Sequence, residues 1–144
     1  IEKRGRKGYL LSIGDEPNLD GMTKTQIKRF LDIDVERDLS ARDILDMAQQ
    51  HWEVFHIVLV NEGRCRYGRD AVLSNWKATL PERTIELQDV NALAETVVSL
   101  IQVTEGARAS DVAATWSGET ALVVANALSG VPAKAAQGRG VQRL

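Results

Sequence analysis

The sequence contains little cysteine, little proline and no long apolar run. One cysteine among 144 residues excludes an internal disulfide and any metal site built from several cysteines. No apolar run approaches the roughly 20 residues that a membrane-spanning helix requires. The basic start IEKRGRK is followed by too short an apolar run for a secretory signal. We therefore expect a cytoplasmic protein that has no membrane partner.

The chain also lacks a strong excess of charge of either sign. Its 18 Lys and Arg residues and 20 Asp and Glu residues give a formal net charge of −2 and a pI near 5.7. Domains that bind nucleic acid are usually basic, so we expect no nucleic-acid partner. A hydrophobic content of 44% and a charged content of 26% are typical of a globular domain with a sizeable core.

Short apolar runs alternate with amphipathic segments along the chain. Thr23 is followed by Gln26 in the spacing of a capping box, and Ser40 begins a second amphipathic stretch. The run VFHIVLV fits a strand that is covered on both faces. This alternation predicts an α/β fold with a parallel sheet. The predicted strands are residues 9–13, 54–60 and 84–87, and the predicted helices begin at Thr23 and Ser40 or cover residues 71–80, 90–103 and parts of 107–130.

The first apolar run suggests a buried strand, yet it ends on two carboxylates in GYLLSIGDEPNLDGM. In open parallel sheets, ligands bind beyond the carboxyl ends of the strands, where Asp15 would lie. A carboxylate there can accept hydrogen bonds from amides at a helix terminus, or bind a hard cation such as Mg²⁺. Asp15 and Glu16 can equally form an ordinary turn with Pro17. The spacing leaves these alternatives open.

The segment NEGRCRYGRD is predicted to be a loop that emerges at the same edge of the sheet. Its three arginines and its tyrosine could hold a phosphate or an acidic partner. Cys65 lies between two arginines, whose charge would lower the pKa of the thiol. We expect Glu16, Arg64, Arg66 and Tyr67 to contact a partner.

No motif in the sequence identifies a catalytic centre. The phosphate-binding GxxxxGK[ST], the dinucleotide-binding GxGxxG and the GxSxG elbow are all absent. His56 lies inside an apolar run, which predicts a hydrogen-bonded core residue. We therefore assign no catalytic residue.

The segment KRGRKGYLLSIGDE, with the helices from Thr23 and Ser40 and the run VFHIVLV, resembles the C-terminal half of a bacterial von Willebrand factor A-like domain. The resemblance implies a Rossmann-like three-layer sandwich, present here in part, with a metal-ion-dependent adhesion site at the sheet edge. Asp15 matches the last part of that site. The DxSxS motif belongs further upstream, so Mg²⁺ binding is expected only of the complete domain. The missing initiator methionine agrees with a longer domain.

The same resemblance implies an organisation and a function for the chain. Residues 1–106 would form the C-terminal half of the domain, residues 107–131 a helical extension and residues 132–144 a flexible tail. The implied function is non-catalytic protein binding in a bacterial multi-protein assembly. The expected partner is an ATPase or the missing N-terminal half.

An alternative is a haloacid-dehalogenase-type phosphatase, because GDEPNLD is similar to the last acidic motif of that family. Asp15 and Asp20 would then hold Mg²⁺, and a nucleophilic aspartate would lie upstream. The following helix, TKTQIKRFL, lacks the alanine and glycine of the family pattern.

Overall fold

The computed structural model describes residues 6–132. The chain divides into two compact units, the first ending at Glu86 and the second beginning at Leu87. Across residues 6–132, no helix has both the length and the apolar character needed to cross a membrane.

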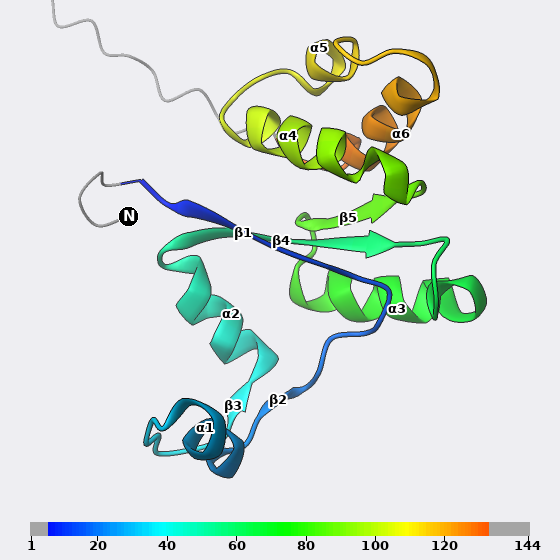
Figure 1. The fold of residues 1–144 in the computed structure, drawn as a ribbon. Helices are drawn as coiled ribbons and strands as arrows, with labels where there is room; N and C mark the ends of the chain where they lie inside the picture. The colour runs from blue at the N-terminus through cyan, green and yellow to red at the C-terminus, as the bar shows by residue number, and fades with distance from the viewer. Residues whose placement is uncertain (1–5, 133–144) are drawn as a thin grey trace, which may run out of the picture. The chain divides into compact units, whose positions relative to one another are not determined.

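The described part of the first unit is built on a three-stranded parallel sheet in the order β1-β4-β5. These strands are β1 (Gly8–Gly14), β4 (Trp52–Leu59) and β5 (Thr84–Leu87). β1 and β4 run in the same direction (Figure 1), in a register that starts with Gly8 opposite Trp52. The predicted α/β class and parallel sheet are therefore confirmed.

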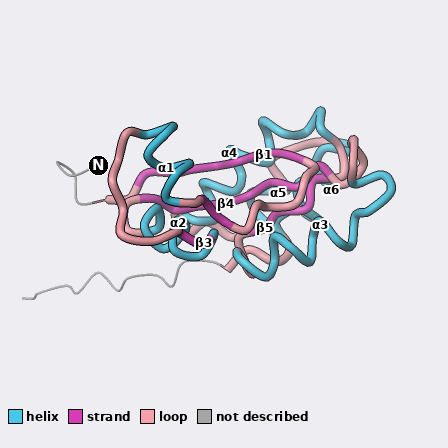
Figure 2. Tube along the Cα trace, turned by 90° about the horizontal axis from the view of Figure 1, so that it is seen from below, coloured by secondary structure: helices cyan, strands magenta, loops and turns pink. Residues whose placement is uncertain are grey.

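The central and outer strands differ in burial. Residues 54–58 of β4 are all buried, as the almost unbroken apolar run VFHIVLV predicts. β1 lies at the edge of the sheet (Figure 2), and its Leu10 and Ile13 are 44% and 46% exposed. The expectation that the first apolar run is a buried strand is therefore wrong, because only one of its edges is paired with another described strand.

Two helices between β1 and β4 begin where their capping residues predict. In α1 (Lys24–Leu31), the Thr23 hydroxyl accepts a hydrogen bond from the Gln26 N–H, and the Gln26 side chain accepts one from the Thr23 N–H. α2 (Ala41–Gln49) begins with the same reciprocal arrangement at Ser40. Each box satisfies backbone donors that the first helical turn leaves without an intrahelical partner.

A short antiparallel pair, β2 (Gly21–Met22) and β3 (Leu39–Ser40), brackets α1 and was not predicted from the sequence. Gly21 has a φ of +148°, and a Cβ atom at this position would collide with the Leu39 carbonyl oxygen. Only glycine permits this close approach of the two backbones.

Helix α3 (Cys65–Thr79) begins earlier than the predicted helix 71–80. Gly68 interrupts it with non-helical angles, φ −147° and ψ 34°, so its first turn is set off from the remainder by a kink. The second half of the predicted loop 61–70 is therefore helical. The helix ends before Pro81, as expected, because a proline disfavours the helical conformation of the residue that precedes it.

The second unit is helical over its described length after β5. Trp116 donates an indole hydrogen bond of 2.8 Å to the Ser99 hydroxyl, which joins α4 (Leu93–Thr104) to the segment before α6 (Gly118–Leu128). The predicted helix 90–103 is confirmed, with a 3₁₀ turn at its start. The elements are η2 (Val90–Ala92), α4 (Leu93–Thr104), α5 (Ala109–Ala113) and α6 (Gly118–Leu128).

The predicted domain boundary at residue 106 stays a prediction. The predicted tail, residues 132–144, lies outside the described residues except for residue 132.

Candidate functional site at the carboxyl end of β1

The parallel sheet brings the segment after β1 next to the loop that precedes α3. The Asp15 carboxylate accepts a hydrogen bond of 2.6 Å from the backbone N–H of Arg64. The Glu16 carboxylate lies 3.5 Å from the Arg64 guanidinium. We call Asp15, Glu16, Gly63 and Arg64 the rim. The expectation that this loop lies beside Asp15 is confirmed.

Asp15, in the segment that follows β1, caps the start of helix α3. Arg64 occupies the N-cap position of α3, and its own side chain makes no capping hydrogen bond. The amides at a helix start lack intrahelical acceptors and carry partial positive charge, so a carboxylate there is stabilising. Caps of this kind contribute roughly 1 kcal/mol. Of the alternatives left open by the sequence, the structure shows the bond to a helix-terminus amide.

Gly63 makes the close approach of Asp15 possible. It has a φ of +35°, and an added Cβ atom would overlap an Asp15 carboxylate oxygen and lie 2.9 Å from the carboxyl carbon. A residue with a side chain would displace the carboxylate or the loop. The sequence places this glycine next to Arg64, but only the fold shows what approaches it.

Two side chains of α3 hold the chain that follows Asp15. The Trp76 indole donates a hydrogen bond of 2.8 Å to the Glu16 carbonyl oxygen. The Asn75 side-chain oxygen accepts one of 2.6 Å from the Asn18 N–H. The sequence gives no signal of this positioning role of Trp76, because the group that the indole contacts lies 60 residues away.

His56 lies in the core beside the same tryptophan. Its ring stacks on Trp76 with centroids 3.5 Å apart and an angle of 9° between the planes. Its Nδ1 lies 2.8 Å from the Ser12 hydroxyl. Burial lowers the pKa of His56 to about 4, so the ring is neutral near physiological pH. The prediction of a hydrogen-bonded core histidine is confirmed.

Cys65 is buried although it lies between two arginines in the sequence. Its thiol lies 3.5 Å from the Asp15 carbonyl oxygen and packs with apolar side chains. Burial and then the negative charge of Asp15 raise the pKa of the thiol, against a smaller opposing effect of Arg69. The prediction of a lowered pKa is therefore wrong, because desolvation outweighs the nearby arginines.

The predicted partner contacts differ in how accessible they are. The Glu16 and Arg64 side chains are mostly exposed, and Tyr67 is 94% exposed. Arg66 is engaged within its own segment: its Nε donates to the Asn61 carbonyl oxygen at 2.9 Å, and its guanidinium lies 3.4 Å from Glu62. Glu16, Arg64 and Tyr67 therefore present the more available groups.

The residues around Asp15 do not on their own make a Mg²⁺ site. Within residues 6–132, no group of three or more His, Cys, Asp or Glu side chains could hold a metal ion. One oxygen of Asp15 is already used by the Arg64 N–H, and a hard cation needs several oxygen ligands. Asp20, the second ligand of the phosphatase alternative, is exposed, and its carbonyl oxygen accepts the Ala41 N–H. Both metal interpretations stay predictions about a longer chain.

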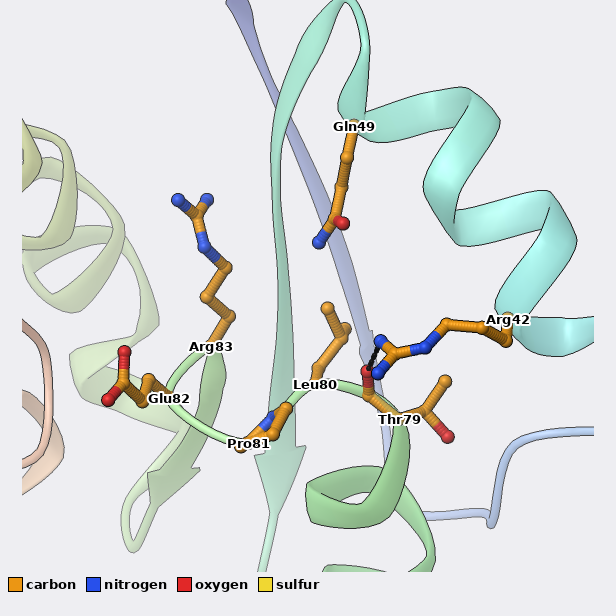
Figure 3. Close-up of a pocket in the computed structure, with 7 residues that line it drawn as sticks. All are labelled: Arg42, Gln49, Thr79, Leu80, Pro81, Glu82 and Arg83. Carbon is orange, nitrogen blue, oxygen red and sulfur yellow. Dashed lines mark hydrogen bonds between the residues drawn. The ribbon is translucent and has the colours of Figure 1, made fainter.

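A cavity of about 310 Å³ lies at the other end of the first unit, where α2 and α3 end and β5 begins (Figure 3). Arg42 donates a hydrogen bond of 3.1 Å to the Thr79 carbonyl oxygen. Arg83 lies 2.7 Å from the Glu53 carboxylate, with its guanidinium 4.9 Å from the centre of the Phe55 ring. Because both arginines are engaged by protein groups, we assign no ligand to this cavity.

No protein family, curated protein or solved structure matches this chain. The geometry of the rim is therefore the basis for inferring a function.

Proposed function

We propose that the chain is the C-terminal part of a bacterial von Willebrand factor A-like domain, with a Rossmann-like three-layer fold, that acts as a non-catalytic protein-interaction module. The order of strands and helices and the parallel sheet support this proposal. The observation that carries it is the fixed position of Asp15 at the start of α3, beside exposed charged groups and Tyr67.

The rim suits a protein partner for two physical reasons. The Arg64 N–H and the Trp76 indole donate hydrogen bonds to Asp15 and Glu16, and Asn75 accepts one from the Asn18 N–H. These bonds hold the backbone in place, so binding would require little further ordering. The rim combines both signs of charge, and the exposed Tyr67 lies beside it, with its N–H bonded to the Arg64 carbonyl oxygen. Tyr and Arg are enriched among the residues that dominate protein interfaces. His56 and Cys65, in contrast, are buried away from any bound molecule.

The proposed partner is another component of the same bacterial assembly, such as an ATPase. In a chain extended upstream, a DxSxS motif would supply further oxygen ligands, and Asp15 would support Mg²⁺ through a water. The Mg²⁺ part of the proposal therefore concerns the complete domain.

A capture experiment tests the proposal. The immobilised chain is mixed with extract of its source bacterium, with and without a chelator, and the captured protein is identified, purified and titrated against the chain. The double variant Arg64→Ala, Tyr67→Ala should weaken binding by an order of magnitude or more, since interface Tyr and Arg side chains often contribute about 2 kcal/mol each. Arg29→Ala, which changes an exposed arginine on α1, is the matched control.

Equal affinity of the double variant and the control would contradict a role of the rim in binding. If the protein extended upstream released phosphate from a generic phosphomonoester in the presence of Mg²⁺, and Asp15→Asn abolished this activity, the phosphatase alternative would be supported instead.

A further inference from the structure

The kink in α3 separates the groups proposed to bind a partner from the body of the helix. Gly68 has non-helical angles, so the first turn, which carries the exposed Tyr67, is set apart from residues 69–79. Arg64 precedes that turn at the N-cap position. Because a kink interrupts the regular helical hydrogen bonds, the helix alone does not fix where Arg64 and Tyr67 lie.

The segment that follows β1 spans this kink from outside the helix. Before the kink, the Asp15 carboxylate accepts the Arg64 N–H at 2.6 Å. After the kink, the Glu16 carbonyl oxygen accepts the Trp76 indole N–H at 2.8 Å, and a further backbone bond joins the same stretch of helix. One short segment, residues 15–18, therefore holds both parts of α3, and we call it the strap.

The attachment of the strap to the helix body depends on the Trp76 indole, and this indole rests on His56. The two rings stack with centroids 3.5 Å apart and 9° between their planes. The His56 ring is itself fixed in the core, since the residue is 3% exposed and Nδ1 lies 2.8 Å from the Ser12 hydroxyl. Its Nε2 has no hydrogen-bond partner among residues 6–132. Within that part of the chain, the stack and the Ser12 contact orient the ring.

We propose that His56 is a positioning residue for the rim, acting through Trp76 and the strap. The buried ring fixes the indole, the indole fixes the strap, and the strap holds the first turn of α3. The core thereby sets where Arg64 and Tyr67 lie, although His56 touches neither. This role rests on the proposed function of the rim, because it holds the binding groups in the position that a partner would use.

Nuclear magnetic resonance of the ¹⁵N-labelled chain tests the positioning without a partner. The readouts are the indole N–H signal of Trp76 and the rate at which the Arg64 amide hydrogen exchanges with water. His56→Ala removes the ring under the indole and should speed Arg64 exchange about 3- to 10-fold, as expected when one hydrogen bond is weakened. His56→Phe keeps a ring that can stack and should restore most of the protection. The indole signals of Trp52 and Trp116 should stay unchanged and serve as references.

Two further variants keep the test decisive should His56→Ala disturb the fold. Trp76→Phe retains an aromatic ring beside His56 and removes the indole donor, so it should speed Arg64 exchange to a similar extent. Ile57→Val is the matched control, because Ile57 is fully buried and its side chain lies on the opposite face of β4. This control should leave the exchange of Arg64, relative to amides later in α3, at the wild-type rate.

Titration with the partner captured through the rim, once purified, tests the consequence for binding. His56→Ala and Trp76→Phe should each weaken binding about 3- to 10-fold, as expected for the weakening of one hydrogen bond, and Ile57→Val should not. In the double variant His56→Ala, Trp76→Phe the losses should not add, because both residues act through the same bond to Glu16.

Two results would overturn the proposal. One is an Arg64 exchange rate that His56→Ala and Trp76→Phe leave at the wild-type value. The other is partner binding that these variants leave unchanged while the double variant Arg64→Ala, Tyr67→Ala weakens it. A failure of the proposed function differs from both: the Arg64→Ala, Tyr67→Ala variant then binds as well as its control, while exchange still responds to His56. That outcome supports the positioning of α3 and refutes only its role in binding.

Discussion

Buried His56 should make the stability of the first unit depend on pH. Its side chain is only 3% exposed, stacks on Trp76 and lies next to the Ser12 hydroxyl. Burial is the cause that lowers its pKa from 6.5 to about 4. Protonation in the folded state would place a charge in the core, where desolvation is costly.

The sign and size of the effect follow from the two pKa values. Between about pH 6.5 and pH 4, the unfolded chain binds a proton at His56 and the folded chain does not. The free energy of unfolding therefore falls as the pH falls through this window. A shift of about 2.5 units at 1.36 kcal/mol per unit gives a loss of at most roughly 3 kcal/mol by pH 4. Above about pH 6.5, His56 is neutral in both states, so it does not change the free energy of unfolding with pH.

Urea unfolding, followed by tryptophan fluorescence at several pH values, measures this loss. His56→Phe keeps a ring that can stack on Trp76 and removes the titrating group. The stability of the wild type should fall more steeply between about pH 6.5 and pH 4 than that of the variant. Other groups that titrate in the window affect both proteins alike and cancel in the comparison. Parallel pH profiles would refute the assignment of the shift to His56.

The remaining predictions concern the rim and the neighbouring thiol. Asp15→Ala should lower the free energy of unfolding by about 1 kcal/mol in urea titrations, through loss of the α3 cap. Gly63→Ala should also lower the free energy of unfolding, because the added methyl group would collide with the Asp15 carboxylate. In an Asp15→Ala background the same substitution should therefore cost less, and additive costs of the two substitutions would contradict this collision. Cys65 should react with a thiol reagent far more slowly in the folded than in the urea-unfolded chain. Equal rates would show that the thiol is accessible.

Local signals in the sequence predicted much of the fold of the first unit. The starts of α1 and α2 were found because a capping residue and its target are three residues apart. The sequence predicts the central strand because the run VFHIVLV is almost entirely apolar and rich in β-branched residues. The pair β2 and β3 escaped prediction because strands of two residues are too short to show a periodic pattern.

The start of α3 and the rim could be predicted only in part. The first turn of α3 has no apolar periodicity, contains a kink at Gly68 and is capped by a residue 49 positions upstream. The sequence predicted that Asp15 and the loop meet, since parallel strands end at the same edge. It could not predict that Cys65 turns into the core, because that depends on the earlier start of the helix.

The capping role of Asp15 changes how its contribution to binding must be tested. Since Asp15 fixes the start of α3, Asp15→Ala would displace Arg64 and Tyr67 and weaken partner binding whether or not a metal takes part. Asp15→Asn separates the two effects, because an amide oxygen still accepts the Arg64 N–H but is a poorer ligand for a hard cation. In the full-length protein, a pure positioning role predicts that Asp15→Asn binds like the wild type and that a chelator changes neither. A metal role predicts that the chelator lowers wild-type binding to the level of Asp15→Asn.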